Sequence, residues 1–174
     1  MNRGVALIAV AAMLVSSCGY SLEGRGITSD PSIKRIGVPL FEDETGRVDL
    51  DARVTEAVVG ELLKRGRFIV VKEATGVDAL VEGRILSYDS VPINFTSSNQ
   101  STEATRYSIT LRASVVYRKV GEREPIWENS SVSIRDEYDL DDSAASFFDR
   151  EEQSIERLAE SFARRLVASM LEAF

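Results

Sequence analysis

Residues 106–118 read RYSITLRASVVYR, and the alternation of apolar and polar side chains in this stretch is the clearest structural signal in the chain. One face carries the apolar set: Tyr107, Ile109, Leu111, Ala113, Val115 and Tyr117. The other face carries the polar set, with Val116 as its one apolar member: Arg106, Ser108, Thr110, Arg112, Ser114 and Arg118. A strand with this period belongs to a sheet with one buried and one solvated face, so helices are expected on one side only.

Two other segments have helical spacing of their apolar residues. The first runs from about 49 to 65, with Asp49 or Asp51 as its predicted N-cap and Gly66 as its C′ stop. Its stripe is Leu50, Val54, Ala57, Val58 and Leu62. The second runs from about 144 to 172 after possible capping oxygens at 141–143. Its stripe is Ile155, Leu158, Ala159, Phe162, Leu166 and Met170. At about 1.5 Å per residue the second helix is roughly 40 Å long.

The remaining strands complete the sheet. Alternation at Ile36, Val38 and Leu40 predicts a strand over 33–41, and 68–71 follows the first helix as a short strand, so a parallel crossover is expected. Residues 79–93 form a third strand, 94–103 a polar hairpin loop, 104–120 the fourth strand and 121–124 a turn. The fifth strand faces inward with Ile126, Val132, Ile134 and Tyr138, and Glu128, Ser130 and Asp136 are polar exceptions in the same phase. The predicted fold is α+β: two helices packed on one face of a mixed four- to five-stranded sheet, in one domain over 33–174.

The N-terminus has the features of a lipoprotein signal. A basic start at Arg3 precedes 12 apolar residues over 4–15, where a membrane-spanning helix needs about 20. Val15, Ser16 and Ser17 then lead into Cys18, which resembles the bacterial lipobox. Residues 1–17 are therefore predicted to be cleaved, Cys18 to carry the covalent lipid, and 18–32 to form a tether. An ordinary signal peptide followed by a free thiol is the alternative.

Composition excludes several classes of function. The formal net charge is −7, which is unfavourable for a general nucleic-acid binder. There is no histidine, and Cys18 is the single cysteine, so zinc sites and Cys–His nucleophiles are not expected. The acidic run 42–44 is interpreted as a solvated turn, because carboxylate catalysis needs acids that converge across a cleft. No metal, no other cofactor and no enzymatic activity are predicted.

Basic residues on the solvated sheet face are the candidate ligand-binding site. Arg106, Arg112 and Arg118 are spaced six residues apart, roughly 20 Å at about 3.3 Å per residue. Arg84 on the adjoining strand and Lys119 or Arg123 near the turn could join them. Guanidinium groups bind phosphate in a bidentate manner, so this face could hold a phosphorylated ligand. The alternative is an ordinary solvated sheet face.

Trp127 is the candidate partner contact. Continuous alternation along the fifth strand places it outward, together with Asn129, Ser131, Ser133 and Arg135. An exposed tryptophan often marks an interface. The alternative is that Trp127 covers the sheet edge or packs under a loop.

Cys18-Gly19-Tyr20-Ser21-Leu22 resembles the start of the mature chain in the lipopolysaccharide-assembly lipoprotein family LptE, for which Cys-Gly-Tyr-x-Leu is typical. Later stretches are similar as well: 36–42, 55–63, 66–68, 81–85 with the hairpin after it, and the amphipathic C-terminal helix. The resemblance implies the same fold and a non-enzymatic protein that plugs the outer-membrane β-barrel LptD, helps it assemble, and takes part in lipopolysaccharide transport. Location on the periplasmic side of the outer membrane is expected, since Gly19 stands where many inner-membrane lipoproteins have Asp.

A second resemblance remains open. Residues 36–41, the following helix and 66–71 are also similar to periplasmic domains of other lipoproteins, among them activators of peptidoglycan synthases and secretion-pore components. This similarity covers the first third of the domain. It would imply regulation of a periplasmic enzyme, or a place in a pore, instead of a plug.

Overall fold

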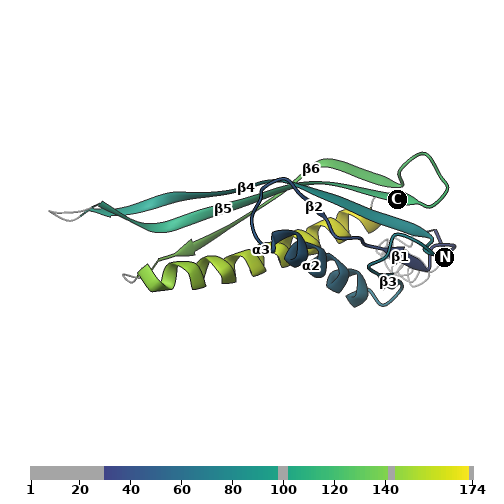
Figure 1. The fold of residues 1–174 in the computed structure, drawn as a ribbon, viewed down its shortest axis with the longest axis horizontal. Coiled ribbons are helices and arrows are strands. Elements are labelled where there is room, and N and C mark those ends of the chain that lie inside the picture. Colours follow the sequence, from purple (N-terminus) through teal and green to yellow (C-terminus); the bar gives the residue numbers. More distant parts are fainter. Residues whose placement is uncertain (1–29, 98–101, 141–143, 173–174) are drawn as a thin grey trace, which may run out of the picture.

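The computed structural model describes residues 30–97, 102–140 and 144–172 (Figure 1). Its elements, in chain order, are β1 (Arg35–Gly37), β2 (Glu42–Asp43), α2 (Leu50–Lys64), β3 (Ile69–Val71), β4 (Ala79–Ser97), β5 (Thr102–Lys119), β6 (Trp127–Asp139) and α3 (Ala144–Glu172). The predicted signal sequence, most of the predicted tether and the predicted caps at 141–143 lie outside the described residues.

The strands form one mixed six-stranded sheet in the order β3-β1-β4-β5-β6, with β2 beside β4. β1 pairs in parallel with both β3 and β4, and α2 is the crossover between β1 and β3, as predicted. β4, β5 and β6 are antiparallel. The β4–β5 hairpin continues past the last β6 pairing, Arg106 with Asp139, to Ser97 and Thr102 (Figure 1).

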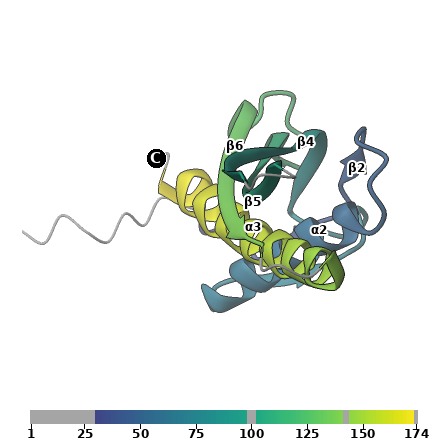
Figure 2. The same cartoon turned by 90° about the vertical axis from the view of Figure 1, so that its left-hand side faces the viewer.

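Both helices cover the same face of the sheet (Figure 2). The predicted stripes are buried: Leu50, Val54, Val58 and Leu62 on α2, and Leu158, Phe162, Leu166 and Met170 on α3. Against them lie the apolar residues of β5, from Ile109 to Tyr117. The two-layer α+β fold is therefore confirmed, with six strands in place of four to five.

Each end of α2 lies at a residue that the sequence predicted, Asp49 at the start and Gly66 at the end. Gly66 has a φ of 66°, a left-handed conformation that glycine adopts without steric cost, and its N–H donates to the Leu63 carbonyl at 3.0 Å. Asp49 occupies the predicted N-cap position. Its φ is 61°, however, and its side chain makes no capping hydrogen bond. The predicted position is confirmed, and the predicted capping interaction is wrong.

Phe41 and Gly83 are packed directly against each other in the core. A Cβ atom on Gly83 would lie 2.1 Å from Phe41 Cε2, so only glycine leaves room for the ring. The Phe41 N–H donates to Thr55 Oγ1 at 3.0 Å, and this hydroxyl donates to the Asp51 carbonyl at 2.7 Å. Residues from three separate similarity stretches, 36–42, 55–63 and 81–85, thus meet at one point.

Two strand predictions need correction. The strand predicted over 33–41 is only three residues long, and Leu40 is 60 % exposed, because the chain leaves β1 and rejoins the sheet as β2 beside β4. The loop predicted over 94–103 is largely strand. β4 continues to Ser97 and β5 begins at Thr102, while 98–101 lie outside the described residues.

Candidate functional site: the polar face of the sheet

The face of the sheet opposite the helices carries the candidate residues, and we call it the polar face. The strand registers place five arginines and six carboxylates on it. The arginines are Arg84, Arg106, Arg112, Arg118 and Arg135; the carboxylates are Glu42, Glu82, Asp89, Glu128, Glu137 and Asp139. The predicted alignment of Arg106, Arg112 and Arg118 on one side of β5 is thus observed, together with Arg84 on β4.

The arginines of the polar face are not free cations. Arg106 pairs with Asp139 across β5–β6 at 2.6 Å, and Arg118 pairs with Glu82 across β4–β5 at 2.7 Å. Both contacts are bidentate, with second bonds of 3.3 and 3.2 Å. Hydrogen bonding to Asp139 raises the pKa of Arg106, and the same bond lowers the pKa of Asp139.

The other two predicted arginines are paired in the same way. Arg112 contacts Asp89 at 3.0 Å and also donates to Ser87 Oγ at 3.0 Å. Arg84 contacts Glu42 at 2.8 Å and Glu44 at 3.3 Å, both from the segment at β2. The positive charge of each predicted arginine is consequently compensated by a carboxylate of the same chain. Exposed ion pairs contribute little to stability, so these pairs set the character of the surface more than the stability of the fold.

Lys119 does not join this face. It pairs with Ala79 in the register, which puts it in the phase of the buried side of β5. Its ammonium contacts Asp30 at 2.6 Å. This contact and the Ser32 N–H lower the pKa of Asp30 to about 2. The placement of Lys119 with the arginines was therefore wrong: it pairs with Asp30, ahead of β1.

Trp127 lies on the opposite side of the sheet from the one predicted. Ala113 pairs with Val132, whereas Val115 pairs with Asn129. The chain therefore advances two positions along β5 but three along β6, which leaves one extra residue in β6. This bulge inverts the phase, and Trp127 pairs with the buried Tyr117 and packs partly against the core. The inference that Trp127 contacts a partner rested on an outward position that the structure contradicts.

A buried polar cluster between α3 and β4 has no counterpart in the sequence predictions. Glu151 on α3 is 7 % exposed; it accepts a hydrogen bond from the Tyr88 hydroxyl at 3.1 Å and pairs with Arg47 at 3.1 Å. The Arg47 guanidinium lies 4.5 Å from the centre of the Tyr88 ring. Burial, and then the Glu151 charge, raise the pKa of Tyr88. One carboxylate held by a cation and a phenol clamps α3 to the sheet.

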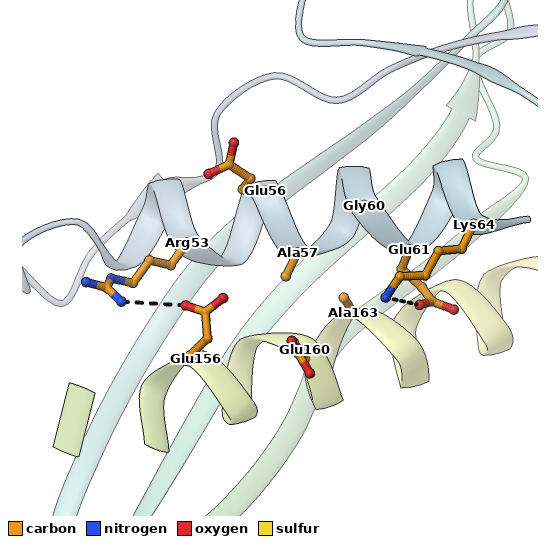
Figure 3. A pocket seen from close by; sticks show the side chains of 9 residues that line it. All are labelled: Arg53, Glu56, Ala57, Gly60, Glu61, Lys64, Glu156, Glu160 and Ala163. Atoms are coloured by element: carbon orange, nitrogen blue, oxygen red, sulfur yellow. Dashed lines mark ion pairs between the residues drawn. The ribbon is translucent and has the colours of Figure 1, made fainter. Parts of the chain in front are cut away.

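A hollow of about 170 Å³ lies where α2 passes α3 (Figure 3). Its floor is made by Ala57, Gly60 and Ala163, and its charged rim includes the Arg53–Glu156 and Lys64–Glu61 pairs, each at 3.6 Å. The remaining lining residues are Glu56 and Glu160. Within the described residues no group of three or more His, Cys, Asp or Glu could hold a metal ion. In the same part of the chain, no helix has the length and apolar character needed to cross a bilayer.

Comparison with known proteins decides the family. The family model described as LptE, lipopolysaccharide-assembly, matches residues 33–170. The chain belongs to the LptE family. The match extends from Ile33, just before β1, to Met170 in the last turn of α3, so it includes the polar face and the β4–β5 hairpin. LptE proteins are non-enzymatic lipopolysaccharide-assembly lipoproteins, which agrees with the function class predicted from the sequence.

Solved structures share the LptE-like fold at low sequence identity. Rare lipoprotein B from Shewanella oneidensis has a TM-score of 0.52 and 15 % identity, over 80 % of this chain and 96 % of that one. A hypothetical protein from Chlamydia trachomatis has a TM-score of 0.51 and 10 % identity, over 82 % and 99 %. The PelC dodecamer subunit of Paraburkholderia phytofirmans has a TM-score of 0.50 and 10 % identity, over 80 % and 86 %. No curated protein sequence matches the chain.

Proposed function

We propose that this LptE-family protein is anchored to the periplasmic side of the outer membrane by lipid on Cys18 and plugs the LptD β-barrel during lipopolysaccharide transport. The observation that carries the proposal is the family match over residues 33–170. The lipobox at 15–18 and the Cys18-to-Leu22 motif support the anchoring. The chain acts by binding and by occupying space, not by catalysis.

The paired charges of the polar face support a role inside a barrel. Barrel lumens are polar, so a plug needs a hydrophilic surface. Burying an unpaired charge at an interface is costly. On the polar face Arg106, Arg112 and Arg118 already have carboxylate partners, so the face can approach another polar wall with those charges compensated.

Partner capture tests the plug proposal. The tagged full-length protein is extracted from native envelopes in mild detergent, purified, and its partners are identified by mass spectrometry. A stoichiometric LptD-type barrel is expected. Recovery of a peptidoglycan synthase or a secretion pore, without a barrel, would support the alternative function. The mass of the N-terminal peptide tests the lipid, and Cys18→Ser serves as the unlipidated control.

We further propose that Arg84, Arg106, Arg112 and Arg118 bind lipopolysaccharide phosphates. Because each is paired, phosphate must compete with a carboxylate of this chain. Bidentate binding to phosphate could replace bidentate binding to carboxylate without leaving the guanidinium uncompensated.

Two matched double variants separate this proposal from an ordinary solvated face. Arg112→Gln with Arg118→Gln removes the cations and should weaken lipopolysaccharide binding in a titration. Asp89→Asn with Glu82→Gln removes the competing carboxylates opposite the same arginines and should strengthen it. The positions are exposed or half-buried, so melting temperatures should change little. Equal binding by both double variants would refute a phosphate site on this face.

A further inference from the structure

Basic residues gather at the corner of the sheet where β1 and β3 begin, and we call them the basic patch. Its members, all exposed, are Lys34, Arg35, Lys64, Arg65 and Arg67. Arg35 lies opposite Ile69 in the parallel register, and the Ile69 N–H donates to the Lys34 carbonyl at 2.8 Å. The basic patch therefore joins the start of β1 to the segment that leads from α2 into β3.

Nearby acids compensate only part of the charge of the basic patch. Glu61 pairs with Lys64 at 3.6 Å and with Arg65 at 3.4 Å. Asp78 accepts the N–H groups of the two basic residues at the start of β1, each at 2.8 Å. These two bonds use the main chain, so both side-chain charges stay at the surface. Five cations against these two acids leave the basic patch with a charge of +3, in a chain whose formal net charge is −7.

Two exposed apolar side chains border the basic patch. Leu63, in the last turn of α2, is 51 % exposed, and Ile69, the first residue of β3, is 58 % exposed. Residues 63–69 read LKRGRFI, so three basic residues lie between them. Phe68 is buried and fixes this segment to the core, and the Arg67 guanidinium lies 5.8 Å from the centre of its ring. Basic groups together with exposed apolar side chains are typical of protein surfaces that bind anionic bilayers.

The basic patch lies close to the proposed lipid anchor. β1, β3 and β4 all begin at this end of the molecule, and the β4–β5 hairpin extends to the opposite end (Figure 1). Asp30, the first described residue, is paired here with Lys119 at 2.6 Å. Twelve residues, 18–29, separate Asp30 from the end of the predicted signal, and a chain of that length spans at most about 43 Å. A lipid on Cys18 would therefore keep the basic patch near the leaflet that holds the lipid.

We propose that the basic patch binds the anionic phospholipid head groups of this leaflet. The inference rests on the lipid anchor proposed above and goes beyond the plug function. Charge complementarity selects the head groups, because guanidinium binds phosphate in a bidentate manner and each basic residue near an anionic bilayer strengthens association roughly fivefold. The anchor raises the local concentration of head groups, so a weak surface is sufficient. A single copy of the chain carries the whole basic patch, which is compatible with one plug in one barrel.

Hydrogen exchange in vesicles tests the binding. The lipidated full-length protein is reconstituted into vesicles of phosphatidylcholine alone, or with one third of the lipid replaced by phosphatidylglycerol, and deuterium uptake is followed by mass spectrometry. Slower exchange over residues 63–70 is expected in the anionic vesicles only. Salt at about 1 M should abolish the difference, because the Debye length then falls to about 3 Å. Residues 91–97, toward the opposite end of the molecule, should exchange equally in both vesicles.

Two matched triple variants separate the basic patch from the overall charge of the protein. The patch variant is Lys34→Gln, Arg35→Gln and Arg67→Gln, and the control variant is Arg157→Gln, Arg164→Gln and Arg165→Gln on α3. The patch variant keeps both pairs of Glu61, and melting temperatures check that each variant is folded. At roughly fivefold for each charge, the patch variant should bind the anionic vesicles about a hundredfold more weakly, and the control variant should bind like wild type.

Several outcomes would overturn the proposal: equal exchange in neutral and anionic vesicles, equal binding by the two triple variants, or slower exchange over 91–97 instead of 63–70. Inorganic phosphate that slows exchange over 63–70 equally well in neutral vesicles would indicate a site for free anions and would overturn it too. The N-terminal peptide of the same digest reports the lipid on Cys18 separately. If that lipid is absent, the anchoring proposal fails, and anionic vesicles added to the unanchored protein still test the basic patch.

Discussion

Replacing Gly83 with alanine should destabilise the domain by forcing the Phe41 ring out of place. The added Cβ would lie 2.1, 2.3 and 2.4 Å from three ring atoms, more than 1 Å inside ordinary contact. Phe41 is 2 % exposed, and its main chain is held by Thr55, so the ring has little freedom to retreat. Overpacking of this kind costs about 1–3 kcal/mol, and the size of the overlap places Gly83→Ala near the upper value. For a domain of this size that corresponds to a fall in melting temperature of roughly 6–12 °C.

Urea unfolding followed by circular dichroism measures the effect, with Gly60→Ala as the matched control. Gly60 is inside α2, and no atom lies within 4 Å of the position that a Cβ would take there, so alanine should stabilise by about 0.5–1 kcal/mol. Phe41→Leu removes the ring edge that clashes and should recover part of the loss when it is combined with Gly83→Ala. Residues in contact typically show coupling of about 0.5–3 kcal/mol. Wild-type stability of Gly83→Ala, or a loss that adds independently to that of Phe41→Leu, would refute the reasoning.

Three further predictions concern charged and buried polar groups. Hydrogen bonds from the Arg35 and Lys34 N–H groups lower the pKa of Asp78, so the folded state binds this proton more weakly than the unfolded state does. Stability should therefore fall as the pH drops below about 4. Asp78→Asn should reduce the pH dependence of the urea unfolding midpoint over pH 2–5, and an unchanged dependence would contradict this. Burial raises the pKa of Tyr117 to about 12, so its stabilising contribution should be fully present below pH 10 and decline as the pH rises toward 12. Tyr117→Phe should remove part of that decline. At pH 7 this variant should be as stable as wild type, because the hydroxyl has no hydrogen-bond partner in the described structure. Glu151→Gln should cost about 1–3 kcal/mol by leaving the Arg47 charge uncompensated, which thermal unfolding would detect; a neutral result would mean that the cluster does not clamp α3.

The sequence by itself determined the helices and strands in which apolar residues recur at a regular spacing within one segment. α3 was predicted over the range observed, and α2 within one residue at each end, because the helical period of their stripes extends over several turns. The alternation of β5 identified the buried face, and the strand–helix–strand order identified the parallel crossover. The family was also accessible to sequence, since its signals are local: the motif at Cys18 and the stretches around Phe41 and Gly83.

The tertiary structure alone decided what faces what across the sheet. The period of a strand is two, so the single extra residue in β6 moved Trp127 to the other face. The polar Glu128 and Ser130 in the predicted inward phase were the local sign of this shift, and they were interpreted as imperfections. The carboxylates that neutralise Arg106 and Arg118 lie 33 and 36 residues away in the chain, so the pairing depended on the register between strands. Local signs of acids on that face were Glu82 next in phase to Arg84, and Glu137 and Asp139 in phase with the outward Arg135. Arginines read from one strand predict a basic surface, and the neighbouring strands determine whether it is basic, because charge is a property of the assembled face.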